Sequence, residues 1–431
     1  MMTIVLTLLI LSVLIFVHEF GHMLAALLVR VRVLRFSIGF GPILASKVIK
    51  GIEFALSAVP FGGYVNLAGS EPKESGEYAP DEFLGQPVRK RIFIILAGPF
   101  ANLILGFFLF LFVYGIYGQQ VTATRRIAKP KEGGQLYQLG IRGGEEIIAI
   151  DGHPVHHWGD VIDLLSEKGR HRMKLVRELA DTFEVVLPET LTDTIYPLIP
   201  PVAWKVVKGM PAWNAGLRDG DTIVMIDSVK IEEWEQLLEI ISAHPEETLT
   251  IKWIHDGKLR EGKIVPIAQV DVSDGERKVG RIGIIAPLIR QRMPIWKAFE
   301  AATISTGRAA FLIFKILGGL LTGKTPFKAV GGPIAIGKAI GQTSSRGLDS
   351  LLVLVALISI NLFVINLLPI PALDGWHLVV FIAEGIARRR LPPKTAQAIQ
   401  YVGFAILIAL MVLITFLDIT RIFHIPIGGA K

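Results

Sequence analysis

Four long apolar stretches constrain this chain more than any other feature, because each is long enough to cross a bilayer as one helix. We predict spanning helices over residues 1–29, 92–117, 348–368 and 398–416. Only 19% of the residues are charged and 51% are hydrophobic, whereas a soluble globular protein carries about a quarter charged residues. A further apolar stretch, 296–321, carries four charged residues at spacings that favour an amphipathic helix lying at the membrane interface. The sequence therefore predicts a polytopic α-helical membrane protein with four spanning helices.

Clusters of basic residues predict how this chain is oriented in the membrane. They lie at the edges of apolar stretches, in the groups Arg30, Arg32 and Arg35; Arg89, Lys90 and Arg91; and Arg388, Arg389 and Arg390. Loops on the cytoplasmic side are enriched in Lys and Arg, so we expect both termini and the region between the second and third spans to face outward. No basic patch is interleaved with aromatic residues, and we therefore predict no nucleic-acid partner. The apolar N-terminus lacks the basic start and cleavage site of a signal peptide, which predicts a retained helix.

Between the second and third predicted spans the composition becomes that of a soluble protein, and the chain repeats itself. Residues 139–151 are echoed by residues 215–227, and Trp158 and Trp234 fall at matching positions. This period indicates two tandem copies of one small domain, over 120–199 and 200–288, inserted between membrane parts 1–119 and 289–431.

The two copies resemble α+β PDZ domains, in which a Gly-Leu-x-x-Gly-Asp turn precedes a strand. The second copy follows this pattern, and the first departs from it at Gly144-Glu145. Two globular domains of another type are the alternative.

A His-Glu-x-x-His sequence lies in the first apolar stretch, as His18, Glu19 and His22. Residues four apart lie on one face of a helix, so both imidazoles can bind one metal ion. Glu19 is then near enough to take a proton from a metal-bound water, whose pKa zinc lowers to about 7. The alternative is a chance occurrence, but ionisable residues within a spanning helix are functional by default. Because the chain has no cysteine, any metal must be held by His, Asp or Glu.

A catalytic zinc ion needs a third protein ligand and one open position. Asp374 is our candidate, because it lies among apolar residues at the end of a predicted span. The alternative for Asp374 is an ordinary turn with Gly375, and His377 is a second candidate ligand. Six other histidines, such as His153, fall in the outer domains.

Residues 18–22 and 366–375 together resemble the site-2 protease family of intramembrane zinc metalloproteases. That family pairs His-Glu-x-x-His on its first helix with Asn-x-x-Pro-x-Pro-x-Leu-Asp-Gly on a later one, and the chain reads Asn-Leu-Leu-Pro-Ile-Pro-Ala-Leu-Asp-Gly there. The tandem PDZ insertion is similar to bacterial members of the family. The resemblance implies that zinc is the cofactor, that His18, His22 and Asp374 are its ligands, and that Glu19 is the general base.

The resemblance also implies substrate-binding residues in two segments. It assigns Asn366 to the substrate backbone, whereas the alternative is a buried amide bonding between helices. Pro369 and Pro371 interrupt the helix, and such irregular backbone is tolerated at membrane depth only where protein or a water-filled cavity surrounds it. In the Pro60–Val65 segment, Gly62, Gly63 and Tyr64 match a membrane-associated β-hairpin near the zinc, whose edge can pair with an unwound substrate. A plain glycine turn is the alternative for that segment.

One further segment matches the family, Ala97-Gly98-Pro99-Phe100-Ala101-Asn102, and its small residues favour a role in helix packing.

These patterns predict hydrolysis of peptide bonds in or near the membrane helix of single-span proteins. By resemblance, the substrates are an anti-sigma factor already trimmed by another protease and remnant signal peptides. The enzyme is expected in a bacterial inner membrane, with the PDZ pair and both termini in the periplasm. The PDZ pair would act as a size filter or bind a freshly exposed C-terminus. The alternatives are a PDZ scaffold with a non-catalytic metal site and a divalent-metal transporter, which should carry more ionisable residues along its spans.

Overall fold

The computed structural model describes residues 2–71, 73, 77–166, 169–177, 181–190, 195–270, 278–323, 331–344, 346–389 and 392–422. The chain divides into two units. The helical unit comprises Met1–Tyr117 and Met293–Lys431, and the inserted unit comprises Gly118–Arg292. Of the basic groups used above, Arg390 lies outside the described residues.

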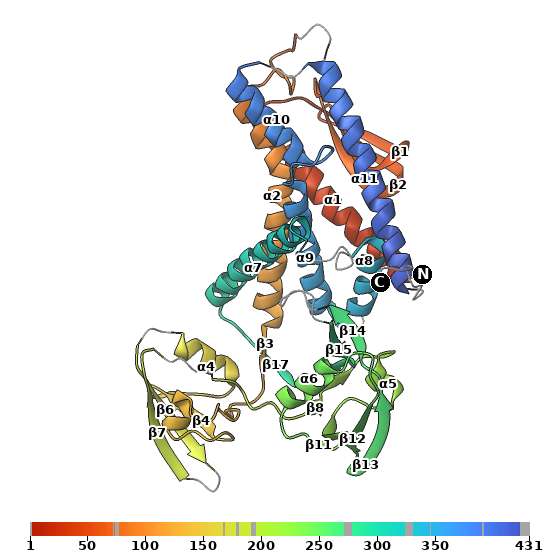
Figure 1. Ribbon diagram of the computed structural model, residues 1–431. Coiled ribbons are helices and arrows are strands. Elements are labelled where there is room, and N and C mark those ends of the chain that lie inside the picture. Colours follow the sequence, from red (N-terminus) through yellow and green to blue (C-terminus); the bar gives the residue numbers. More distant parts are fainter. Residues whose placement is uncertain are drawn as a thin grey trace. The chain divides into compact units, whose positions relative to one another are not determined.

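The helical unit contains seven helices within its described residues. All of them are labelled in Figure 1. Their bounds are α1 Met2–Leu28, α2 Val88–Phe112, α7 Ile295–Leu321, α8 Pro333–Ser344, α9 Leu348–Asn366, α10 Asp374–Ala387 and α11 Pro393–Ile422. A π-helical turn, η1 Val113–Tyr117, continues α2. Proline begins α8 and α11 and directly precedes α2 and α7, as expected for a residue whose missing N–H is not needed in a first turn.

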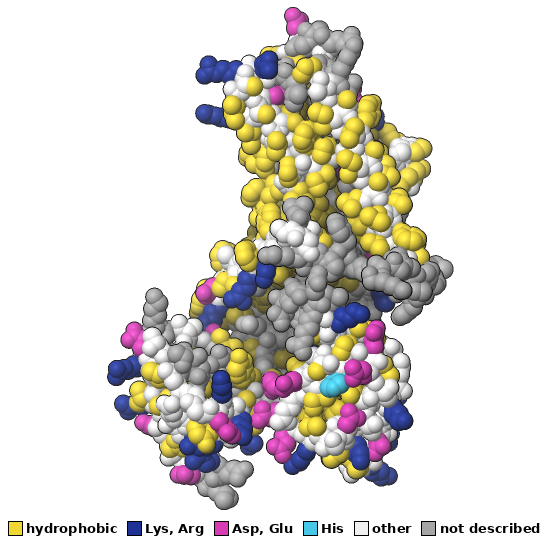
Figure 2. Space-filling view, viewed as in Figure 1, with side chains coloured by type: hydrophobic (Ala, Val, Ile, Leu, Met, Phe, Trp, Pro, Cys, Tyr) yellow, Lys and Arg dark blue, Asp and Glu magenta, His cyan; other side chains and the backbone are white. Residues whose placement is uncertain are grey.

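Five of the described helices are long and apolar enough to cross a membrane. Four of them, α1, α2, α9 and α11, coincide with the predicted spans. The fifth is α7, the least apolar of the five, which the sequence assigned to the interface. Ala302 and Ala309 of α7 pack with Phe110 of α2 and with Ala356 and Ile360 of α9, and α7 runs obliquely across α2 in Figure 1. Hydrophobic side chains cover most of the visible face of the helical unit in Figure 2.

The segment after α1 forms one long antiparallel hairpin. Its strands are β1 Val33–Ile49 and β2 Ile52–Leu67. The first part of β1 pairs on one side with residues 53–56 and on the other with residues 63–67. Residues 63–67 therefore form an edge of this sheet, and no other described strand pairs with their outer side. We call residues 63–67 the edge strand.

The inserted unit contains the two repeats, and both have the same connectivity of two strands, a helix and two strands. In the first repeat these are β4 Glu146–Ile150, β5 His153–Pro154, α4 Trp158–Leu165, β6 His171–Arg177 and β7 Asp181–Leu187, with sheet order β5-β4-β6-β7. In the second they are β10 Asp221–Ile226, β11 Val229–Lys230, α6 Trp234–Ala243, β12 Leu249–His255 and β13 Lys258–Ile264, with order β11-β10-β12-β13. The internal repeat is thus present in the fold as well as in the sequence.

The first repeat has Glu145 where the second has Asp221, and the turn before the strand is nevertheless the same in both. The backbone N–H of Arg142 donates to the Glu145 carboxylate at 2.8 Å, and the N–H of Arg218 donates to Asp221 at the same distance. The longer side chain of Glu145 therefore closes the same turn as the aspartate.

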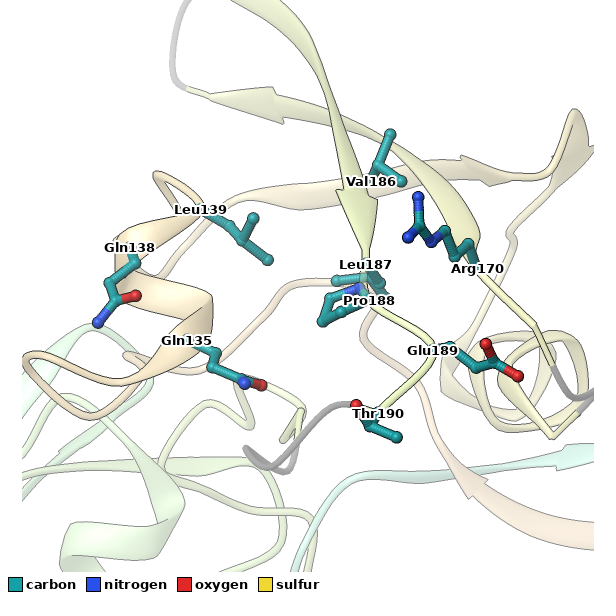
Figure 3. A pocket seen from close by; sticks show the side chains of 9 residues that line it. All are labelled: Gln135, Gln138, Leu139, Arg170, Val186, Leu187, Pro188, Glu189 and Thr190. Atoms are coloured by element: carbon teal, nitrogen blue, oxygen red, sulfur yellow. The ribbon is translucent and has the colours of Figure 1, made fainter.

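The remaining elements of the inserted unit are short. They are β3 Gln119–Thr122, α3 Gln135–Gln138, β8 Val202–Ala203, β9 Lys205–Val206, α5 Pro211–Asn214, β14 Ile267–Val270, β15 Lys278–Arg281, β16 Ile284–Ile285 and β17 Leu288–Gln291. Strand β3 pairs with β17, which joins the two ends of this unit. The first repeat has a surface hollow of about 540 Å³. Figure 3 shows its lining, which comes from α3, from Arg170 and from residues at and after the end of β7.

Candidate metal centre

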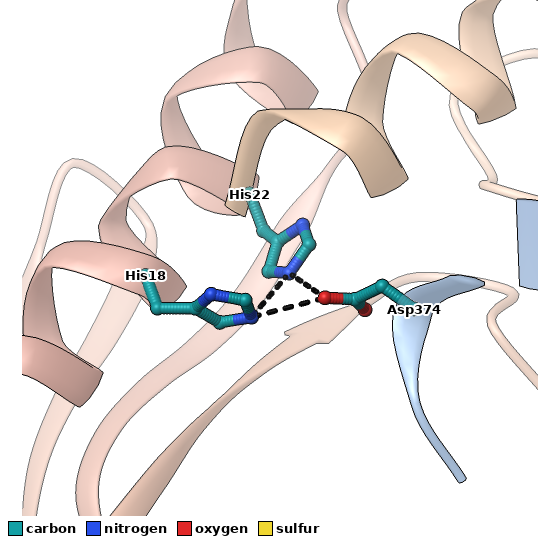
Figure 4. Close-up of side chains that lie close together, drawn as sticks. All are labelled: His18, His22 and Asp374. Atoms are coloured by element: carbon teal, nitrogen blue, oxygen red, sulfur yellow. Dashed lines mark hydrogen bonds and ion pairs between the residues drawn. The ribbon is translucent and has the colours of Figure 1, made fainter. Parts of the chain in front are cut away.

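The first helix and the start of α10 bring three potential ligands together. His18 and His22 lie one turn apart on α1, and both are buried. Asp374 is the first residue of α10 and follows the proline-containing loop after α9. In that loop Ala372 adopts a left-handed φ of +82°, which residues with a Cβ rarely do and which is often found at functional sites. Figure 4 shows the three side chains pointing toward one another.

The distances between the donor atoms suit a zinc ion. His18 Nε2 lies 3.2 Å from His22 Nε2. Asp374 Oδ2 lies 3.0 Å from His18 Nε2 and 3.5 Å from His22 Nε2. Two ligands bound at 2.0–2.1 Å to a tetrahedral zinc ion are about 3.3 Å apart. Within the described residues, these three form the one His, Asp and Glu cluster that could hold a metal, and a four-coordinate zinc ion held by them would have one position left for water or substrate.

The ring of His22 is held by the neighbouring helix α2. Its Nδ1 lies 2.8 Å from the main-chain oxygen of Ile94. Since a carbonyl oxygen only accepts, Nδ1 donates and Nε2 keeps its lone pair for a metal. Gly98, one turn further along α2, leaves space for the His22 ring, because a Cβ at this position would lie 2.2 Å from His22 Nε2. The sequence interpretation assigned this segment to helix packing and missed its contact with the site.

Glu19 points toward the edge strand. Its Oε2 accepts a hydrogen bond from the backbone N–H of Val65 at 3.1 Å. Gly63 lies beside it, because a Cβ there would be 2.7 Å from the Ser37 carbonyl oxygen and 3.6 Å from Glu19 Cγ. The structure thus places the carboxylate next to the edge strand, whose outer side pairs with no other strand among the described residues.

The other sequence-predicted substrate residues lie in several places. Gly62 has a φ of +102° and packs against the ring of Phe40. Tyr64 stacks on that ring, and its hydroxyl accepts from the Arg35 guanidinium at 3.2 Å.

Asn366 is the half-buried last residue of α9. Pro371 lies against α11, where a Cβ on Gly403 would be 2.0 Å from Pro371 Cβ. His377, the second candidate ligand, is outside the three-residue cluster and has its ring 6.2 Å from that of Phe381.

Two imidazoles, one carboxylate, an open fourth position and a neighbouring glutamate define the class of zinc-dependent metallopeptidases. The comparison with known proteins agrees. Residues 6–410 match the model of peptidase family M50. The chain belongs to this family.

Relatives align over nearly the whole chain. The regulator of sigma-E protease RseP of Escherichia coli is 31% identical over 451 residues, covering 96% of this chain and 97% of that protein. The regulator of sigma E protease of Haemophilus influenzae is 30% identical over 437 residues, covering 95% and 97%. A predicted zinc metalloprotease of Ralstonia nicotianae is 30% identical over 451 residues, covering 96% and 97%. The chain is therefore a zinc metalloendopeptidase, and its apolar helices and bacterial relatives indicate a protein of a bacterial inner membrane.

Solved structures also match a smaller part of the chain, and one of them serves as an example. A PDZ domain of the SdrC-like protein from Listeria monocytogenes aligns with 21% of this chain and 85% of that domain, at 23% identity and a TM-score of 0.17. A score this low supports no conclusion about the repeats.

Proposed function

We propose that this zinc metalloendopeptidase cleaves a peptide bond in or near the membrane segment of single-span proteins. His18, His22 and Asp374 hold the zinc ion, and Glu19 is the general base. The observation that carries the proposal is the cluster of two buried imidazoles and one half-buried carboxylate on apolar helices, with Glu19 between the two histidines along α1.

The side chains divide the work of hydrolysis between them. Zinc, when bound, acts as a Lewis acid and lowers the pKa of water to about 7. Glu19 accepts the proton that this water loses and later delivers it to the amide nitrogen of the leaving chain. The N–H of Val65 orients one oxygen of Glu19, so the other oxygen is available for this transfer. Water is consumed, one peptide bond breaks, and a carboxylate and an amine are formed.

The edge strand suits a substrate that has left its helical form. A helix already satisfies its own backbone hydrogen bonds, and an unwound segment in a membrane needs new partners. A strand edge that pairs with no other strand can supply them by strand addition. The N–H of Val65 points away from β1, toward Glu19, so a segment paired at this edge would lie beside the proposed base. Gly63 and Tyr64 belong to this edge strand, Gly62 precedes it, and we propose that Asn366 and Pro371 complete the substrate site from the other side.

The membrane arrangement in this proposal has four spans, α1, α2, α9 and α11, and α7 lies at the interface. Two observations support the interfacial role, because α7 is the least apolar of the five long helices and carries charged residues along its length. The hairpin exposes large apolar side chains, including Phe40, Leu44 and Val48, which favours contact with lipid. Both termini and the inserted unit are then periplasmic, as the basic loops predict.

The substrates in this proposal follow from the relatives. Two of them are named as regulators of sigma E, which supports an anti-sigma factor, trimmed beforehand by another protease, as one substrate. Remnant signal peptides are proposed as a second class. The two repeats are proposed to be PDZ domains that exclude untrimmed substrates by size, or that bind their new C-termini.

A cleavage assay with Glu19→Gln tests the catalytic proposal. The full-length protein in lipid is incubated with a trimmed single-span substrate, and bound zinc is measured in the same sample. We expect roughly 10²–10⁴-fold slower cleavage with zinc retained. The matched control is Glu300→Gln on the exposed face of α7, which should cleave normally. A scaffold would function equally well with either substitution, and unchanged cleavage by Glu19→Gln would reject the proposal.

A further inference from the structure

Helix α2 presents one face to the two imidazoles of α1, and its contacts repeat every four residues. The Ile94 carbonyl accepts from His22 Nδ1, and Gly98 lies against the His22 ring. Asn102 comes one turn later and reaches the other imidazole: its Nδ2 lies 3.3 Å from His18 Nδ1. The four-residue spacing of these positions matches the spacing of the two histidines, because residues four apart lie on one face of a helix.

The side chain of Asn102 is not accounted for by packing alone. Asn102 is fully buried, at 0% exposure. Its Oδ1 is also buried, and it has no hydrogen-bond partner among the residues that the structure describes. A buried amide oxygen without a partner costs about 1–3 kcal/mol, so this arrangement requires an explanation.

The chemistry of the metal ligand supplies one. His18 Nε2 faces His22 and Asp374 at 3.2 Å and 3.0 Å, so it is the nitrogen available to the ion. A neutral imidazole that binds through Nε2 carries its proton on Nδ1 and donates from it. Nδ2 of Asn102 is also a donor, and two donors cannot bond to each other. Rotating the amide by 180° places Oδ1 against Nδ1–H, so that this acceptor and this donor become partners.

We propose that Asn102 is a positioning residue for the metal centre, with its Oδ1 accepting from His18 Nδ1–H. It would fix the tautomer and ring orientation of His18, as the Ile94 carbonyl does for His22. Such hydrogen bonds to metal-binding histidines also raise the basicity of the ligand. The inference rests on the proposed ligand role of His18.

Zinc affinity of the full-length apoprotein tests this role directly. Zinc dissociation constants are measured by competition with a chelator, and thermal unfolding of the apoprotein is recorded alongside. We expect Asn102→Leu, which has no acceptor, to bind zinc about 10–100-fold more weakly. Asn102→Asp keeps an acceptor oxygen and should bind zinc as tightly as the wild type or more tightly.

The matched control is Ser359→Ala. Ser359 is fully buried on α9, and its hydroxyl donates to the main-chain oxygen of Asn102 at 2.7 Å. This substitution removes a buried hydrogen bond to the same residue without touching His18. It should lower the unfolding temperature of the apoprotein and leave the zinc dissociation constant unchanged.

The outcomes separate this inference from the proposed function. If the wild type binds zinc and Asn102→Leu binds it equally well, the positioning role is wrong and the ligand assignment stands. If Asn102→Leu does not fold, Asn102→Asp decides, because a role that required the amide as donor predicts loss of zinc in that variant. Failure of the wild type to bind zinc would overturn the proposed function itself.

Discussion

A methyl group added at Gly98 would occupy the space that the His22 ring fills. The Cβ of Gly98→Ala would lie 2.2, 2.5 and 2.7 Å from Nε2, Cε1 and Cδ2 of His22. The ring cannot easily turn away, because its Nδ1 bonds to the Ile94 carbonyl and its Nε2 faces Asp374. The substitution therefore acts directly on a proposed zinc ligand.

The size of the effect follows from the displacement that is needed. Carbon and nitrogen atoms in ordinary contact are about 3.4 Å apart or more, so Nε2 must move by about 1.2 Å. Zinc–ligand distances tolerate deviations of about 0.2 Å, and a misplacement of about 1 Å at a catalytic centre costs on the order of 10²-fold in rate. We expect Gly98→Ala to lose at least about 100-fold in cleavage and to bind zinc more weakly.

The assay compares Gly98→Ala with Gly307→Ala in the same lipid preparation. Gly307 lies within α7, and nothing is within 4 Å of a Cβ placed there. Both changes raise the helix propensity by about 1 kcal/mol, so the difference between the variants reports the clash. Wild-type zinc affinity and cleavage in Gly98→Ala would refute this reasoning.

Three further predictions follow from the described contacts. Val65→Pro removes the N–H that reaches Glu19, at an edge position where proline is tolerated. Membrane-substrate cleavage should fall well below that of Val65→Ala, and equal rates would count against the orientation of Glu19 by this N–H. Arg91 and Glu384 form a buried ion pair at 2.8 Å. Arg91→Leu leaves the carboxylate without this partner and should lower the free energy of unfolding by about 3–5 kcal/mol. The double variant Arg91→Leu/Glu384→Leu should recover most of the lost stability in thermal unfolding. Hydrogen bonds from a backbone N–H and an imidazole lower the pKa of Asp151 below its ordinary 3.8. The free energy that this shift contributes to folding is fully present above pH 3.8 and is lost as the pH falls through the lowered pKa. Asp151→Asn should therefore reduce the acid sensitivity of the first repeat to limited proteolysis, and an unchanged acid profile would contradict this.

The features that sequence predicts well are those that depend on spacing along one element. His18 and His22 share a helical face because they are four residues apart, and the apolar stretches predict α1, α2, α9 and α11 by length alone. The two repeats could be recognised in the sequence because turns of the same shape require the same kinds of residue. In both copies an acidic side chain accepts the N–H three residues before it, at Arg142 and Arg218.

The features that sequence could not predict depend on contacts between elements. Nothing in the sequence around Gly98 and Asn102 shows that they face the imidazoles, because the rotation of α2 about its own axis is fixed only by its packing against α1. Helix α10 was missed because prolines precede Asp374 and basic residues follow, a pattern also typical of a loop. The resemblance indicated a hairpin at Pro60–Val65, but not that its two strands extend over Val33–Ile49 and Ile52–Leu67. The edge strand emerges only from the pairing of β1 with two parts of β2.

Zinc binding by Asp374→Ala and His377→Ala tests the central claim most directly, that distant parts of the chain hold one ion. Asp374 Oδ2 lies within 3.5 Å of both imidazole nitrogens, whereas His377 is outside the cluster. The predicted result is a large loss of zinc affinity in Asp374→Ala and wild-type affinity in His377→Ala. Undiminished zinc binding by Asp374→Ala, or its loss in His377→Ala alone, would contradict the proposed site.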